Sequence, residues 1–292
     1  MQDGTLSLGG GGTNTSAAYT IETGATLNFS GSAVFNLDSD STISGTGTLL
    51  KDGPSLLMLS GRNPDFTGPT TVNGGTLEVY GSLPHSPIAL NAGTTLGGSG
   101  TVDTVTSTAA TISPAIMTAL GNVTFDSNST FVVELDGPNP DAGGYDQLSV
   151  TGTVDLAGST LSPSLGFTST FGQSFTIIHS TSPIVGQFKG LAEGAKFMIG
   201  VVPFTITYVG GSGDDVVLTQ DDTRQATTTT TASSQNPSDI GQLVTFTATV
   251  APTAEQAQRL ATSPSRSMAR PGRRCPSSPS AARIRPRLRS RP

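Results

Sequence analysis

Residues 45–77 read GTGTLLKDGPSLLMLSGRNPDFTGPTTVNGGTL, a stretch in which short apolar runs alternate with glycine-containing corners. Its last three residues form a small phrase, Gly-Thr-Leu, which recurs along the chain with an extra Ala or Thr in some copies. The phrase ends at leucines that are 21, 22, 28 and 19 residues apart, namely Leu6, Leu27, Leu49, Leu77 and Leu96. A phrase that returns at such intervals indicates a repeat architecture.

The repeat predicts a coil that completes one circuit about every twenty residues. Glycine permits the corners, and side chains alternate between the two faces of each strand, so Leu, Val and Phe point inward while Thr, Asn and Ser point outward. Each circuit pairs with the next about 4.8 Å along the axis, and no circuit buries its apolar face alone. We therefore predict an all-β parallel β-helix. The pattern leaves open an ordinary β-sandwich with glycine-rich turns.

The order of residues in 45–77 resembles the autotransporter-associated β-strand repeat, also called the passenger-associated transport repeat. The shared pattern is Gly-x-Gly-x-Leu-x-Lys-x-Gly, a leucine-rich strand, Gly-x-Asn, an aromatic-x-Gly step, Thr, Val and Gly-Gly-x-Leu. This chain has Phe66 where the pattern usually has Tyr, and Pro54 and Pro64 where Gly or a polar residue is commoner. The resemblance implies a right-handed β-helix of secreted or surface-exposed bacterial proteins, with an architectural repeat that has no active site.

Residues 1–120 hold these repeats, and the strands lengthen from about Gly121. The segment Tyr145–Val150, YDQLSV, resembles the module that closes such helices. A closing module has a physical purpose, because the last coil of a solenoid exposes unpaired N–H and C=O groups that invite aggregation. We assign 121–222 to the continuation of the β-helix and its C-terminal cap.

A change of composition after Asp222 predicts a linker and a second module. Residues 227–231 are five consecutive threonines, and 244–250 alternate with period two, as a half-buried strand does. The stretch resembles the opening of a bacterial Ig-like domain repeat. Such a sandwich needs about seven strands, so 223–254 is interpreted as a linker and the first strands of an incomplete Ig-like domain.

The tail 255–292 is rich in Arg, Pro and Ser and has no strand pattern. It holds ten arginines and one acid, a net charge of +9, whereas residues 1–254 hold five cations and 20 acids, a net charge of −15. A chain of this composition is expected to be disordered. We interpret the tail as a frameshift product, because a shifted reading of permitted codons restores an alternating strand with a Gly/Thr/Pro turn.

Composition excludes several classes of function. Charged residues make up only 12% of the chain, against about 25% in average domains. The single cysteine, Cys275, lies in the tail, so the rest of the chain has no disulfide or Cys-metal chemistry. No aromatic residue accompanies the tail arginines, which argues against specific nucleic-acid binding. The sequence shows no signal peptide and no run long enough for a transmembrane segment.

We predict no catalytic, cofactor-binding or metal-binding residues. Residues 210–217 fit one copy of a calcium nonapeptide, but calcium in such rolls lies between successive copies, so a turn before a final strand is expected. His85 and His179 have no Cys, second His or spaced acid nearby in the sequence. The acid pairs Asp38/Asp40 and Asp221/Asp222 fall in expected turns and linkers, where solvated carboxylates are ordinary.

These observations predict a non-enzymatic structural or adhesive segment of a large secreted or surface-exposed bacterial β-repeat protein. Its expected partners are the neighbouring repeats of the parent chain and a surface glycan or other cell-surface partner. Two alternatives stay open. One is a polysaccharide-active β-helix enzyme, either a lyase or a glycosidase. The other is a glycan-binding adhesin module, for which the sequence identifies no patch.

Overall fold

The computed structural model describes residues 4–140, 143–222 and 227–252, and every regular element in them is a β-strand. The chain divides into two compact units at about residue 224. We call the described residues 4–222 the body and 227–252 the hairpin unit. No helix of the described residues is long and apolar enough to cross a membrane.

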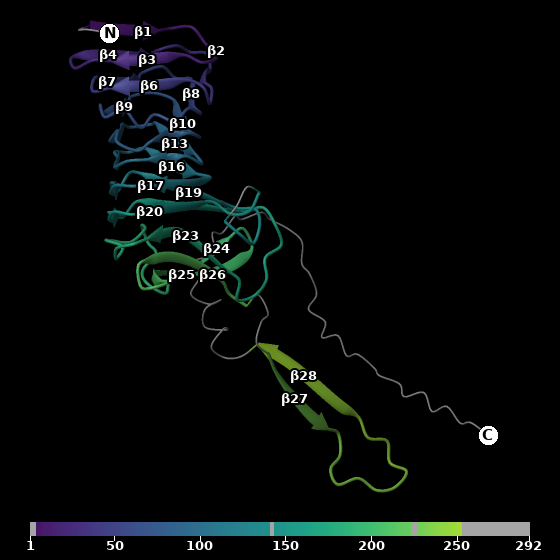
Figure 1. The fold of residues 1–292 in the computed structure, drawn as a ribbon. Helices are drawn as coiled ribbons and strands as arrows, with labels where there is room; N and C mark the ends of the chain where they lie inside the picture. Colours follow the sequence, from purple (N-terminus) through teal and green to yellow (C-terminus); the bar gives the residue numbers. More distant parts are fainter. Residues whose placement is uncertain (1–3, 141–142, 223–226, 253–292) are drawn as a thin grey trace, which may run out of the picture. The chain divides into compact units, whose positions relative to one another are not determined.

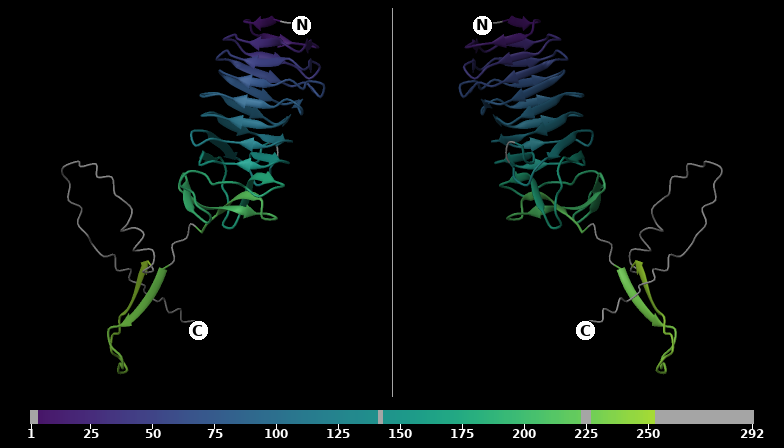
Figure 2. Two further views of the ribbon diagram at one scale, coloured as in Figure 1. Left: turned by 90° about the vertical axis from the view of Figure 1, so that its left-hand side faces the viewer. Right: turned by 90° about the vertical axis from the view of Figure 1, so that its right-hand side faces the viewer.

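The body is a parallel β-helix whose coils contribute strands to two continuous sheets and, from β11 onward, to a third (Figures 1 and 2). All neighbours in the first two sheets are parallel, as in a chain that winds repeatedly around one axis. In order across the sheet, the first sheet contains β1 (Gly4–Leu8), β4 (Ala25–Phe29), β7 (Thr48–Lys51), β9 (Thr70–Val72), β12 (Ile88–Leu90), β15 (Val105–Ser107), β18 (Val123–Thr124) and β21 (Val154–Asp155). The second sheet contains β2 (Gly12–Asn14), β5 (Phe35–Leu37), β8 (Leu56–Leu59), β10 (Thr76–Val79), β13 (Thr95–Gly98), β16 (Thr111–Pro114), β19 (Thr130–Leu135) and β22 (Thr160–Leu165).

The third sheet begins parallel and ends antiparallel. It contains β11 (Ser82–Leu83), β14 (Thr101–Val102), β17 (Ile116–Ala119), β20 (Gln147–Val150), β23 (Ser174–Ser180), β26 (Asp215–Gln220), β25 (Val202–Gly210) and β24 (Lys196–Ile199). In the first coils, β3 (Ala18–Ile21) pairs with β6 (Thr42–Gly45), and single bridges link Gly45 to Phe66 and Arg62 to Ser82. The all-β prediction and the parallel β-helix are thus confirmed.

The recurring leucines do not all lie on one sheet. Leu6, Leu27 and Leu49 are register partners in the first sheet, as one circuit per repeat requires. Leu77 and Leu96 are partners in the second sheet. The step of 28 residues therefore exceeds one circuit, and the prediction that it is one circuit was wrong. Leu57, which pairs with Leu77, holds the equivalent inward position of the preceding coil without the Gly-Thr phrase.

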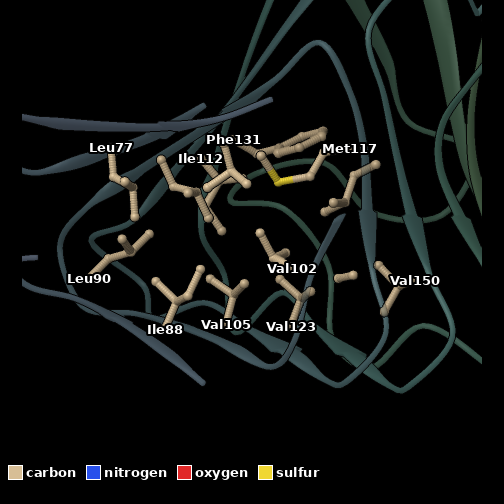
Figure 3. Close-up of a cluster of buried hydrophobic side chains, with 14 of the residues drawn as sticks. Leu77, Ile88, Leu90, Val102, Val105, Ile112, Met117, Val123, Phe131 and Val150 are labelled. Carbon is tan, nitrogen blue, oxygen red and sulfur yellow. The ribbon is translucent and has the colours of Figure 1, made fainter. Parts of the chain in front are cut away.

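Apolar side chains from all three sheets fill the interior. Ile88, Val105 and Val123 come from the first sheet, Ile112 and Phe131 from the second, and Val102, Met117 and Val150 from the third (Figure 3). On the outside of the second sheet, five threonines are register partners in successive coils: Thr76, Thr95, Thr111, Thr130 and Thr160. The inward and outward sets alternate along strands such as β8, β10, β16 and β19, which is the pattern the sequence predicted.

One cation belongs to the interior. Lys51 is 1% exposed and lies in the inward row of the first sheet between its register partners Phe29 and Val72. Its Nζ donates to the carbonyl oxygens of Gly53 and Gly74, the latter at 2.9 Å. Burial lowers the pKa of Lys51 from its ordinary value. The lysine of the repeat pattern therefore ties two consecutive coils together at a corner.

A polar ladder runs along the corner that follows the first sheet. Asn28 Nδ2 donates to Asp52 Oδ2 at 2.7 Å, and Asn73 Nδ2 donates to Asp52 Oδ1 at 2.8 Å. Asn91 Nδ2 extends the ladder to Asn73 Oδ1 at 2.5 Å. These side chains link four successive coils, so the exposed corners are joined by hydrogen bonds that supplement the backbone ladder.

The body ends in an antiparallel cap made of β24, β25 and β26. β26 pairs antiparallel with β23, and β25 with both β26 and β24. Aromatic rings gather beneath this cap: Phe175 contacts Tyr145, Phe167 and Phe204 with ring centroids 5.3–6.1 Å apart. After β23 the chain passes the first sheet once more, where Val185 bridges Asp155 in parallel, and the antiparallel strands then close the body above the rings.

The hairpin unit consists of β27 (Thr227–Ser233) and β28 (Phe246–Pro252), which pair antiparallel. Phe246 and Val250 are exposed on this hairpin, at 77% and 63%. Two strands do not make a sandwich, so the Ig-like assignment of 223–254 stays a prediction. The predicted disordered tail 255–292 lies outside the described residues.

Candidate functional site

A shallow groove crosses the outer face of the second sheet. Its volume is about 220 Å³, and its floor is formed where β13 and β16 carry small residues. Gly97 is the register partner of both Glu78 and Ser113, so the outward row loses its side chain at Gly97 and has only a short one at Ser113. Larger side chains of β10 and β19 stand at the two ends of the depression.

Tyr80 and Glu78 form one end of the groove. Tyr80 is 45% exposed, although it is a large aromatic residue. Its hydroxyl donates to Glu78 Oε2 at 3.0 Å, which fixes the ring beside the carboxylate. Burial, and then the hydrogen bond and negative charge of Glu78, raise the pKa of Tyr80. The phenol therefore stays protonated and keeps its ring presented to the groove.

Glu134 and Asp146 form the opposite end. Asp146 Oδ2 accepts a hydrogen bond from the Glu134 backbone N at 2.8 Å, and Asp146 N donates to Glu134 O at 2.9 Å. Burial raises the pKa of Asp146 to about 6, with the nearby charges of Glu134 and Asp136 adding to the effect and the Glu134 hydrogen bond opposing it. Asp146 belongs to the predicted closing module, but nothing in its sequence context indicated a groove.

Replacing Asp146 by asparagine is expected to flatten the pH dependence of stability between about pH 4 and 6. The folded-state pKa is raised, so the stability that Asp146 contributes is greatest below its ordinary pKa and falls as pH rises toward 6. Asparagine keeps an oxygen for the Glu134 N–H but carries no charge. For this partly exposed group we expect a gain on the order of 1–2 kcal/mol at neutral pH.

The measurement is the free energy of unfolding in urea at several pH values for the wild type and Asp146→Asn. The exposed Asp65, changed to asparagine, is the control for removing one charge from the body. The stabilising effect of Asp146→Asn should disappear at acidic pH, where both proteins are neutral at this position. A gain of equal size at pH 4 and pH 7 would contradict the assigned role of the carboxylate.

His179 has a carboxylate partner that sequence reasoning missed. Its Nδ1 lies 2.9 Å from Asp215 Oδ1, which also accepts a hydrogen bond from Ser180 N at 3.1 Å. No acid lies near His179 in the sequence, and it is the fold that brings Asp215 beside it. The two residues are 36 positions apart and meet because β23 and β26 pair antiparallel. The His179 side chain is 53% exposed and that of Asp215 8%, so the pair fastens the cap to the last parallel strand at the surface.

The other predicted positions lie apart from the groove. Residues 211–214 form the turn between β25 and β26, where Ser212 Oγ donates to Asp214 Oδ1 at 2.7 Å. His85 is exposed. Asp38 accepts from Ser41 Oγ at 2.8 Å, and this hydrogen bond lowers its pKa. Asp221 binds Lys196 Nζ at 3.1 Å. Among the described residues, no group of three or more His, Cys, Asp or Glu is placed to hold a metal ion.

The groove carboxylates are not spaced for glycoside hydrolysis across it. Glu78 lies on β10 and Glu134 on β19, three strands further along the second sheet. Three strand spacings amount to about 14 Å, whereas the two carboxyl groups of glycosidases are about 5–9.5 Å apart. The arrangement instead offers acceptors at both ends of a groove and an aromatic face at one of them.

The stacked coils define the class of this protein, a β-solenoid built from an architectural repeat. Residues 49–79 match the model of the passenger-associated transport repeat. The match begins in β7 and ends in β10, so it covers one circuit and the following strand. This match confirms that residues 49–79 are similar to the passenger-associated transport repeat, as the sequence pattern predicted.

A curated relative supports the same assignment. The chain is 35% identical over 94 residues to the adhesin BmaC autotransporter of Brucella suis biovar 1 (strain 1330). The similarity covers 29% of this chain and 3% of that protein. The chain therefore corresponds to a small part of the length of this relative.

Proposed function

We propose that the body is a structural segment of a larger adhesive protein that is exposed on a bacterial surface or secreted. The observation that carries the proposal is the unbroken parallel pairing of the first two sheets, which joins eight strands in each sheet from one coil to the next. Stacked coils with a continuous interior form a stiff element whose length grows with the number of coils. The adhesin named above supports the surface location.

In this role the body has no catalytic activity of its own. Five stacked threonines form one outward row of the second sheet, and the buried Lys51 donates hydrogen bonds to carbonyl oxygens at a corner between coils. Glu78 and Glu134 stand at opposite ends of the groove, too far apart to act together on one glycosidic bond. The body is a spacer that holds adjoining modules at a set distance.

A spacer made of equivalent coils should tolerate the removal of a whole coil. Deleting residues 76–94 joins Gly75 to Thr95, which then takes the place of its register partner Thr76 against β8. We expect this shortened body to unfold cooperatively, with little loss of stability, and to be about 4.8 Å shorter by small-angle X-ray scattering.

The matched control deletes one residue fewer, 76–93. Thr95 then occupies the inward position of Leu77 and Leu96 the outward position of Glu78, so the apolar set of the strand faces solvent. This variant should lose several kcal/mol in urea unfolding. If the two deletions were equally destabilising, the coils would not be interchangeable units and the spacer proposal would fail.

A further inference from the structure

We propose that the groove on the second sheet binds consecutive amino sugars of a glycan. Tyr80 is the stacking face and Glu78 an acceptor at one end, and Glu134 and Asp146 are acceptors for ammonium and hydroxyl groups at the other. The inference goes beyond the spacer role and does not depend on it. Binding of a ligand in the groove would leave the stacked coils, and therefore the spacer role, unchanged.

The groove is longer than one sugar ring, because its two ends lie about 14 Å apart, so consecutive rings of a linear glycan would meet the two ends. Its volume is about 220 Å³ and it is open at the surface, so further rings of an oligosaccharide can extend into solvent. Gly97 leaves the floor empty at the centre, while the hydroxyl-bearing Thr76 and Thr95 line one side. A small number of polar groups that converge on a concavity is the usual arrangement of a ligand site.

Tyr80 supplies the apolar contact that a sugar ring requires. The C–H face of a pyranose packs on an aromatic ring, and an amino group beside it gains from the negative ring face. Tyr80 is held for this purpose by its hydrogen bond to Glu78, so little side-chain freedom is lost on binding. An exposed aromatic with a fixed orientation is a common anchor of binding surfaces.

The charge of the groove selects the ligand class. Three carboxylates line it, and neither ion pair found among the described residues, His179–Asp215 and Lys196–Asp221, involves any of them. Carboxylates accept hydrogen bonds and attract cations, and they repel other carboxylates. The groove is therefore complementary to glucosamine units and opposed to uronic acids.

The test measures binding of a tetramer of β-1,4-linked glucosamine to the full chain by isothermal titration calorimetry at low ionic strength. We expect saturable binding that weakens as salt is added. The N-acetylated tetramer, which lacks the charge, should bind at least tenfold more weakly. Equal binding of the two glucosamine tetramers, or no binding of either, would overturn the assignment.

Variants locate the site. Tyr80→Ala and Glu134→Gln should each weaken binding about tenfold, whereas Asp65→Asn, which removes one charge outside the groove, should change it less than twofold. Gly97→Thr fills the floor, and its Cβ would lie 3.2 Å from Ser113 O, a contact that needs only a small shift. Loss of binding with normal unfolding in Gly97→Thr supports the groove, and wild-type binding refutes it.

The same experiment separates this inference from the spacer role and from an enzyme. Oligosaccharide recovered intact after prolonged incubation is expected of a binding site, while shortened products would replace the proposal with a glycosidase. Failure to bind would not affect the coil-deletion test, because the deletion of residues 76–94 is assessed by unfolding stability and by the length of the body. The two proposals can therefore fail separately.

Discussion

Replacing Gly68 by alanine is expected to leave the body unable to fold stably. A Cβ at Gly68 would lie 1.7 Å from the carbonyl oxygen of Gly47 in the preceding coil. The backbone cannot move away at low cost, because Thr67 N donates to Gly45 O at 2.9 Å and Ser86 Oγ donates to Gly68 O at 2.7 Å. We expect a loss of more than about 4 kcal/mol, which few single substitutions reach.

The measurement is urea unfolding followed by far-ultraviolet circular dichroism. The matched control is Gly10→Ala, since a Cβ at Gly10 meets no atom within 4 Å and its backbone is not in the left-handed region. That substitution should be neutral or stabilise the body by up to about 1 kcal/mol. If Gly68→Ala stayed within 1 kcal/mol of the wild type, close coil stacking at this corner would be disproved.

The second large effect is expected at Asn63, whose amide joins three coils. Its Oδ1 accepts from Ile43 N at 2.6 Å, and its Nδ2 donates to Gly61 O at 3.0 Å and to Ser82 O at 3.1 Å. The residue is 3% exposed. Asn63→Asp would turn a carboxylate oxygen toward two carbonyl oxygens in a buried site, so we expect a loss of about 3–5 kcal/mol at neutral pH.

Comparison with alanine and a pH series tests the cause. Asn63→Ala should cost less, about 1–3 kcal/mol, because it leaves the Ile43 N–H unpaired but buries no charge. Burial should raise the pKa of the introduced aspartate, so Asn63→Asp should regain stability as pH falls below neutral. Asn128→Asp, an exposed change of the same charge, should stay within about 0.5 kcal/mol. Equal losses for Asp and Ala at every pH would contradict this account.

Both effects arise at positions that the repeat pattern contains. The pattern includes Gly68 as the glycine of the aromatic-x-Gly step and Asn63 as the Asn of Gly-x-Asn. The sequence alone does not say what either residue does physically. The structure shows that each is fixed by the coil next to it. Such contacts cross about twenty residues of chain, so no local propensity reports them.

The groove could not be predicted for the same reason. Tyr80 follows β10, Gly97 lies in β13 and Glu134 in β19, and only the register of the second sheet places them along one depression. The His179–Asp215 pair was missed because β26 returns antiparallel beside β23 after 36 residues. The 28-residue step from Leu49 to Leu77 was misread because the Gly-Thr-Leu motif predicts a strand but does not indicate to which sheet that strand belongs.

The sequence by itself determined that this chain is an all-β coil with glycine corners, inward Leu, Val and Phe, and outward Thr, because alternation and turn chemistry are local properties of a strand. Only the tertiary structure decided which strands share a sheet, that Lys51 lies inside, where the cap reverses direction and which side chains meet at the groove. Those features depend on how many residues each coil contains before the next coil pairs with it. That number is set by the packing between many successive coils, which is not a local property of the sequence.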